Sequence, residues 1–260
     1  MASPVTSRLV RALAVVGDFS AFAGRALVDI VRPPFEGRET LRQLVELGWR
    51  SVPLIGASGF AVGIVLSLHT RASLERFGAE ALVPAGLGIA LIRETGPLTA
   101  GLLLAGRMGA GIGAEVAAMK VTEQVDALEA TAVDSFRFLV VTRVLACIIA
   151  LPLLTTLMNF SGILGGWLAE FAMTAMPLGL YLERAFSMID FPLYLPSTAK
   201  TAVFGFLIAV TGAYQGLTTS GGTEGVGRAA TRSVVMASVL LIAANVVLVR
   251  LIFFLFPEVQ

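Results

Sequence analysis

The stretch ALVPAGLGIALIRETGPLTAGLLLAG, residues 81–106, decides the fold class of this chain. It is long enough to cross a bilayer as a helix, because about 20 apolar residues span the hydrocarbon core. Two adjacent charges, Arg93 and Glu94, lie within it. Inserting each such charge costs roughly 2.5–3.5 kcal/mol, so these groups usually face a protein interior or a wet cavity. The pair therefore predicts a functional site inside a membrane protein.

Composition extends this interpretation to the whole chain. Hydrophobic residues make up 56% and charged residues 14% of the 260 positions, and the mean hydropathy is +0.85. Too little polar surface remains to cover a soluble globule. We predict an all-α, polytopic membrane protein with a single membrane domain, residues 51–260. Its five spans are expected at about 52–68, 81–106, 144–167, 201–217 and 234–256.

Residues 1–50 are expected to form interfacial and elbow helices. A cleavable signal peptide is disfavoured because Gly17 and Asp18 interrupt the apolar run that it would need. The first amphipathic helix would place Leu9, Leu13 and Val16 on one side and Arg8 and Arg11 on the other. The second would turn Leu41, Leu44, Val45 and Leu47 toward lipid and Arg42, Glu46 and Arg50 toward water.

Lysine and arginine placement predicts the orientation. One side of the membrane would carry most of these residues, and the other would hold Arg71, Arg76, Arg184, Lys200 and Arg250. The richer side should be cytoplasmic, which places the N-terminus and the connection 107–143 inside the cell. Segment 176–196 would lie outside, as either a re-entrant or an interfacial helix.

Several classes of function are disfavoured by composition. A formal net charge of +1 argues against a nucleic-acid partner. A single cysteine, Cys147, and a single histidine, His69, exclude an internal disulfide and a cysteine or histidine metal cluster. The glycine-rich stretches 109–113 and 221–227 lack the P-loop pattern, so ATP would have to be bound by another subunit.

The connection 107–143 contains a predicted amphipathic helix at about 119–133. Apolar residues recur at helical spacing at Val121, Val125, Leu128 and Ala132, whereas Glu123, Asp126 and Glu129 share another face. An acidic face gains nothing from the anionic inner leaflet, which leaves a protein partner or simple solvation as its explanation.

Arg93 and Glu94 point about 100° apart on a helix, so each is expected to have a partner elsewhere. Glu94 would be either an interhelical hydrogen-bond anchor or part of a substrate path. Pro97 lacks an N–H opposite the carbonyl of Arg93, which predicts a kink. Asn245 is expected to donate a hydrogen bond between helices. Three G-x-x-x-G pairs would allow close helix packing within the chain or between copies: Gly59 with Gly63, Gly162 with Gly166, and Gly212 with Gly216.

Six separated motifs resemble the MlaE/YrbE permeases of bacterial ABC-type lipid transporters, over residues 41 to the C-terminus. They are LIRETGP (91–97), AGRMG (105–109), AEVAAMKVTEQ (114–124), AVD (132–134), LPLL (151–154) and GVGRAATR (225–232).

The resemblance implies a homodimeric, non-catalytic permease of the bacterial inner membrane that carries phospholipid. Its implied partners are a pair of cytoplasmic ATPase subunits that use ATP and Mg²⁺, a periplasmic Mce-domain (MlaD-like) protein, and a STAS-domain (MlaB-like) subunit. Such a system maintains outer-membrane lipid asymmetry or carries out lipid uptake or export. The chain itself would hold no cofactor and no metal.

By the same resemblance, the lipid site would comprise Leu66, Leu74, Phe77 and Glu94, with Arg93 beside it. Relatives can carry tyrosine at the position of Phe77. Segment 119–133 would be the coupling helix that docks on the ATPase, through Lys120, Thr122, Glu123, Gln124, Asp126 and Glu129.

Two other classes of protein remain as alternatives. A proton-coupled secondary transporter would use Glu94 as a relay and would need no ATP. A membrane-embedded enzyme would need a catalytic cluster, which the predicted spans lack.

Overall fold

A computed structural model describes the backbone of residues 4–255 and the side chains of residues 13–255. The side chains of Arg8, Leu9 and Arg11, and the predicted span end at Phe256, lie outside the described residues. Five helical runs within this range are long and apolar enough to cross a membrane. The predicted class, a polytopic all-α protein with five spans, is confirmed. The runs are Gly37–Glu75, Glu80–Val121, Arg137–Thr174, Phe191–Leu217 and Gly222–Leu255.

The first run is assembled from three elements. Helix α2 (Gly37–Gln43) continues through the π-helical turn η1 (Leu44–Trp49) toward α3 (Val52–Glu75). Leu41 and Val45 are exposed, as predicted, but Leu44 and Leu47 pack against the main hydrophobic cluster. The prediction that all four face lipid is therefore wrong for Leu44 and Leu47, because the π-helical turn rotates this segment onto α8.

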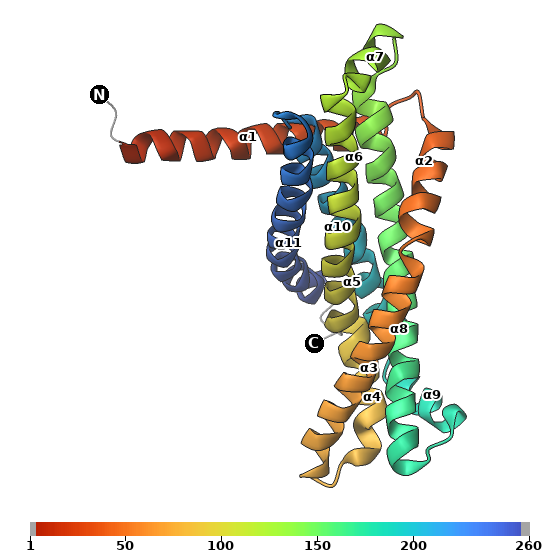
Figure 1. The fold of residues 1–260 in the computed structure, drawn as a ribbon. Coiled ribbons are helices and arrows are strands. Elements are labelled where there is room, and N and C mark those ends of the chain that lie inside the picture. Colours follow the sequence, from red (N-terminus) through yellow and green to blue (C-terminus); the bar gives the residue numbers. More distant parts are fainter. Residues whose placement is uncertain (1–3, 256–260) are drawn as a thin grey trace.

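Two π-helical turns interrupt the second run, which begins with a short 3-10 turn. It comprises η2 (Glu80–Leu82), α4 (Val83–Ala90), η3 (Leu91–Thr95), α5 (Gly96–Leu104), η4 (Ala105–Gly109) and α6 (Ala110–Val121). The turns η3 and η4 are π-helical. Such turns are frequent at functional sites, and η3 contains Arg93 and Glu94. A short helix, α7 (Gln124–Ala130), follows at one end of the bundle (Figure 1).

The remaining spans are longer than the sequence predicts. The third combines η5 (Arg137–Val141) with α8 (Thr142–Thr174), the fourth is α10 (Phe191–Leu217), and the fifth is α11 (Gly222–Leu255). Segment 176–196 contributes the short helix α9 (Leu178–Phe186) and the start of α10. Helix α9 lies at the end of the bundle opposite α7, and α1 (Pro4–Ile30) runs across the bundle axis near α7 (Figure 1).

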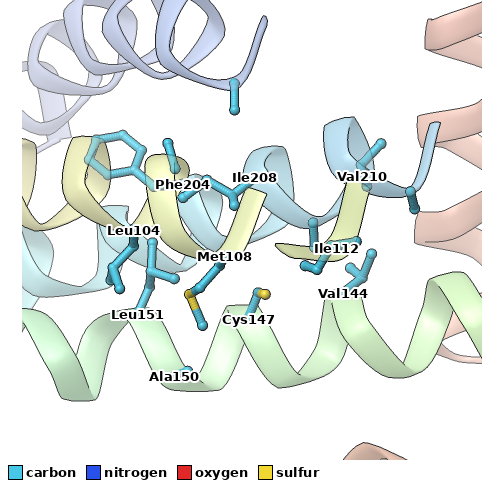
Figure 2. Close-up of a cluster of buried hydrophobic side chains, with 14 of the residues drawn as sticks. Leu104, Met108, Ile112, Val144, Cys147, Ala150, Leu151, Phe204, Ile208 and Val210 are labelled. Atoms are coloured by element: carbon cyan, nitrogen blue, oxygen red, sulfur yellow. The ribbon is translucent and has the colours of Figure 1, made fainter. Parts of the chain in front are cut away.

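The main core lies between the second, third and fourth spans. Leu104, Met108 and Ile112 meet Leu151 and Cys147 of α8 and Ile208 of α10 (Figure 2). A smaller cluster joins Leu87 and Leu91 to Ile163 and to Tyr181 of α9. In contrast, 6% of the apolar window of α11 is buried, so this helix presents most of its surface outward. The exposed apolar surface of α11 is available to lipid or to a partner.

Glycines set the closest helix contacts. A Cβ on Gly63 of α3 would overlap the backbone of Gly162 of α8. A Cβ on Gly216 of α10 would lie 2.6 Å from the Cβ of Val116 in α6. These G-x-x-x-G glycines are therefore used for packing within the chain, where small residues allow close backbone approach and the resulting dispersion contacts.

Candidate polar site and its pocket

The centre of the candidate site is a carboxylate held by two other spans. Glu94 Oε1 accepts a hydrogen bond from Lys200 Nζ of α10 at 2.9 Å. Its other oxygen accepts one from Asn245 Nδ2 of α11 at 3.1 Å. The second, fourth and fifth spans therefore meet at Glu94. The predictions that Glu94 has a partner elsewhere and that Asn245 donates between helices are confirmed.

The backbone of η3 explains why a lysine is needed there. Pro97 has no N–H to donate to the carbonyl of Arg93, four residues earlier. Lys200 Nζ donates to that carbonyl oxygen at 3.0 Å. One ammonium group thus satisfies both the carboxylate and the backbone oxygen that the proline leaves unpaired. Such replacement of a lost helical bond is how proline is tolerated in membrane helices.

Burial of the two charges is unequal. The side chain of Lys200 is 1% exposed, whereas that of Glu94 is 38% exposed. Lysine is rarely buried so fully unless it is paired. Lys200 is therefore the interior member of the ion pair, and Glu94 presents its other side to open space.

That open space is a pocket of about 880 Å³ along α11. It is lined by Glu94, Asn245, Val246, Val249, Arg250, Phe253 and Phe254. The guanidinium of Arg93 lies over the ring of Phe253, 4.6 Å from its centroid. The pocket thus has a polar end at Glu94 and a long apolar wall, the usual character of a site for amphiphilic ligands.

The structure corrects the expected position of Lys200. We expected it on the outer side of the membrane, because the fourth span was predicted to begin at residue 201. Helix α10 begins at Phe191 instead, with Pro192 in its first turn, where proline is tolerated. Buried Leu193, Ser197, Lys200 and Phe204 follow at helical spacing. This periodicity was the sequence signal that could have located Lys200.

The other residues expected to bind lipid lie apart from Glu94. Leu66 packs against the cluster around Leu87 and Leu91, and Leu74 is half-buried. Phe77 is 82% exposed. It lines a second pocket of about 710 Å³, together with Val65, Leu68, His69, Ala72, Ser73 and Arg76. Within one chain, therefore, Phe77 and Glu94 belong to different pockets.

An ion cluster joins the C-terminal part of α3 to η2 and to the C-terminal part of α8. Arg71 donates to Glu170 Oε2 at 2.8 Å and lies 3.3 Å from Glu80 Oε2. Glu170 is 1% exposed, and the hydroxyl of Ser67 lies 3.5 Å from its other oxygen. Arg71 is thus a structural clamp beside the second pocket.

The predicted coupling segment differs from one continuous helix at 119–133. Helix α6 ends at Val121, and Glu123 has a left-handed backbone conformation with φ of 60° before α7 begins at Gln124. Lys120 lies at the end of α6 and pairs with Asp126 at 3.0 Å, while the hydroxyl of Thr122 bonds back to Ala118. The turn therefore separates the two helices.

Helix α7 presents a polar surface at the end of the bundle. Glu123, Gln124, Asp126 and Glu129 are exposed, whereas Val125 is buried. Glu129 accepts a hydrogen bond from Ser135 at 2.6 Å. Below α7, Arg143 of α8 is buried and pairs with Glu115 of α6 at 2.7 Å. This ion pair joins α6 to α8, and α7 packs against α6.

The chain is similar to several known proteins. The family model described as Permease MlaE matches residues 40–251. A probable ABC transporter permease protein of Rickettsia felis is 37% identical over 97% of this chain and 98% of its own length. The intermembrane phospholipid transport system permease protein MlaE of Haemophilus influenzae is 33% identical over 82% of each chain. The TRIGALACTOSYLDIACYLGLYCEROL 1 protein of Arabidopsis thaliana chloroplasts is 30% identical over 87% of this chain and 65% of its own length.

Proposed function

Because this chain belongs to the MlaE permease family, we propose that it is the membrane subunit of an ABC transporter that moves phospholipid. The observation that carries the proposal is the pocket at Glu94, which combines a partly exposed carboxylate with an apolar wall inside the span region. Its volume and its combination of a polar end with an apolar wall suit a lipid, whose headgroup and tails need different surroundings. The name of the Haemophilus relative supports phospholipid as the cargo.

The pocket would be completed by a second copy of the chain. Helix α11 leaves its apolar face uncovered, and Val246, Phe253 and Phe254 form part of that face. A homodimer that buries α11 would enclose the pocket and bring a second wall to it. Leu66, Leu74 and Phe77 would then contact acyl chains nearer the periplasm, as the family resemblance implies.

Energy would come from a cytoplasmic ATPase dimer that binds ATP and Mg²⁺. The exposed acidic face of α7, with Lys120 and Thr122 beside it, would dock on that dimer. Movement of α7 would pass directly into α6, because two residues separate these helices. The π-helical turns η4 and η3 follow along the same span, and η3 contains Arg93 and Glu94. Motion of α6 would therefore reach these two residues through the π-helical turns.

This assignment places the chain in the bacterial inner membrane with its N-terminus and α7 on the cytoplasmic side. An Mce-domain protein would receive or deliver lipid at the periplasmic end, and a STAS-domain subunit would accompany the ATPase. The system would maintain outer-membrane lipid asymmetry or exchange lipid with the periplasm. The chain would carry out no covalent chemistry.

Reconstitution tests the proposal. The complex of this chain with its ATPase is placed in vesicles, and transfer of a fluorescent phospholipid to a periplasmic acceptor is followed with and without ATP. Transfer should require ATP and should fall when Glu94 is replaced by glutamine. Transfer driven by a pH gradient in the absence of the ATPase would instead support the proton-coupled alternative, against which the Glu94–Lys200 ion pair argues.

A further inference from the structure

A small polar pocket, the arginine pocket, lies at the start of α11, at the opposite end of that helix from the pocket that Glu94 lines. Its volume is about 160 Å³. Arg228 and Arg232 line it from α11, and polar residues at positions 215 and 218–220 line it from the end of α10 and the loop between the two helices. The sequence motif GVGRAATR (225–232) thus supplies two cations to a site that is separate from the pocket at Glu94.

The arginine pocket carries more positive than negative charge. Arg228 Nη1 donates to Glu224 Oε1 at 3.1 Å, and the two side chains are 50% and 79% exposed. Such an exposed pair is weak, so Arg228 can exchange its partner for another anion. Arg232 pairs with no carboxylate among the side chains of residues 13–255. An anion in the pocket would therefore be attracted by two guanidinium groups and repelled by one carboxylate.

The loop between α10 and α11 limits the freedom of one of these guanidinium groups. Gly221 has a φ of 96°, a backbone conformation that glycine adopts without strain. A Cβ at this position would lie 2.9 Å from Nη2 of Arg228. The guanidinium of Arg228 therefore packs against the loop backbone, and less side-chain entropy is lost when it binds a ligand.

Neighbouring elements indicate where the arginine pocket lies relative to the membrane. Helix α1 crosses the bundle axis (Figure 1) and exposes several apolar side chains, as a helix in a membrane surface does. The ring of Phe22 in α1 lies 5.4 Å from that of Tyr214 in α10, and Tyr214 precedes the pocket residue Gln215. The apolar run of α11 begins at Val234, two residues after Arg232. The arginines therefore lie at the depth of α1, where the phosphates of a bilayer lie.

An apolar stripe follows the two arginines along α11. Positions 228, 232, 235 and 239 are separated by steps of four, three and four residues, so their side chains lie on one helical face. Val235 is 59% exposed and Val239 is 62% exposed. An acidic side chain of a protein partner would reach the arginines but leave this stripe uncovered. A lipid would place its phosphate at the arginines and an acyl chain along the valines.

The size of the arginine pocket agrees with this occupant. Pockets that enclose a whole small-molecule ligand measure about 300–1,000 Å³, so a pocket of about 160 Å³ holds a headgroup and leaves the rest of the molecule outside. Basic pockets between membrane helices on the cytoplasmic side are typical sites for anionic headgroups.

We propose that Arg228 and Arg232 bind the phosphate of an anionic phospholipid of the surrounding leaflet, with an acyl chain along Val235 and Val239. Arginine suits this role because its planar fork donates two parallel hydrogen bonds to phosphate oxygens. This lipid is a bound component of the bilayer and not the transported cargo. It would link the start of α11 to the end of α10 beside α6, on which both helices pack. The site goes beyond the proposed function.

The experiment measures which lipid lies beside the stripe. A photoreactive amino acid is placed at Val239 in the permease–ATPase complex, which is reconstituted in phosphatidylcholine nanodiscs. The discs contain a small fraction of alkyne-tagged phosphatidylglycerol or of alkyne-tagged phosphatidylcholine with the same chains, and the yield of crosslinked lipid is compared after irradiation. Leu153 of α8, an apolar position that is 63% exposed, is the reference position outside α11.

At Val239 the yield from phosphatidylglycerol should exceed that from phosphatidylcholine about tenfold, because two arginines at the membrane surface attract an anionic headgroup. At Leu153 the two yields should be equal. Changing both arginines together, Arg228→Gln with Arg232→Gln, should abolish the preference at Val239. Changing both to lysine should keep part of it, because the charge remains without the planar fork. Arg184→Gln, which removes a positive charge from α9, should leave the preference unchanged.

Several results would overturn the proposal. One is equal yields from the two lipids at Val239 in wild-type protein, and another is a preference that survives the double glutamine change. Crosslinking of neither lipid at Val239 would show that a second copy of the chain or another protein covers the stripe. Loss of the preference in millimolar inorganic phosphate, but not in sodium chloride of the same ionic strength, would identify a site for free phosphate. A preference that appears only when the ATPase is omitted would assign the arginines to that partner.

Discussion

Replacing Glu94 by glutamine should destabilise the protein more than replacing its partner Lys200 by methionine. Glutamine keeps the shape of the side chain and can still accept a hydrogen bond, but it removes the negative charge. The ammonium of Lys200, 1% exposed, would then be buried without a counter-charge. Methionine at position 200 would instead leave Glu94 without its counter-charge. The side chain of Glu94 is 38% exposed, and it would still accept a hydrogen bond from Asn245.

The magnitude follows from the geometry of the pair. Two unit charges 2.9 Å apart attract by about 6 kcal/mol at an effective dielectric constant of ~20, which is a ceiling for the interaction. Breaking a buried pair typically costs about 3–5 kcal/mol, and the exposure of Glu94 screens part of this. We expect about 3 kcal/mol for Glu94→Gln and about 1 kcal/mol for Lys200→Met. The double variant should be more stable than Glu94→Gln alone, by about 1–2 kcal/mol.

The assay is equilibrium unfolding in mixed micelles, with sodium dodecyl sulfate as denaturant and the four proteins compared in one detergent. The order of stability should be wild type, Lys200→Met, the double variant and Glu94→Gln. Equal losses for the two single variants, with additive loss in the double variant, would show that the charges do not interact and would refute the reasoning.

Three further perturbations test other parts of the structure. Changing Glu123 and Asp126 together to lysine should weaken co-purification with the ATPase, while the exposed Glu183→Lys on α9 should not; an undiminished complex would remove the docking role of α7. Gly63→Ala should cost about 1–3 kcal/mol in the same unfolding assay because its Cβ would overlap the backbone of Gly162, whereas Gly56→Ala, which meets nothing within 4 Å, should be neutral or stabilising. Glu115→Ala should cost about 2–3 kcal/mol in the free energy of unfolding, because it leaves the 2%-exposed side chain of Arg143 without its carboxylate partner. Arg143→Met should cost less, since the side chain of Glu115 is 47% exposed. The reverse order would contradict this account of the pair.

Hydropathy was sufficient to predict the five spans, because each crossing needs a long apolar helix whatever its neighbours are. It located their ends poorly. The fourth span was placed ten residues too late because Pro192, Pro196 and Lys200 interrupt its apolar run. Pro192 is tolerated in the first helical turn, and Lys200 is tolerated because a carboxylate faces it. Pro196 lies inside the helix, where membrane helices accept proline more readily than soluble ones do.

The candidate site was also partly predictable from hydropathy. A charged pair in an apolar span must find partners, so the sequence marked Glu94 but contained no local signal for which residues those partners are. Lys200 lies 106 positions away, and the contact depends on how three spans pack. The interruption between α6 and α7 was also missed, because periodicity across residues 119–133 does not reveal a left-handed residue at Glu123.

The most direct test of the central claim is photo-crosslinking of lipid inside the pocket during transport. A photoreactive amino acid is placed at Val246, which lines the pocket, and at Leu153 of α8, a matched apolar position that is 63% exposed and lies outside the pocket. The permease–ATPase complex is reconstituted with labelled phospholipid and irradiated with and without ATP. The account predicts crosslinking at Val246 that changes when ATP is added, and crosslinking at Leu153 that does not. Crosslinking that changes equally at the two positions when ATP is added, or that changes at neither, would contradict the account.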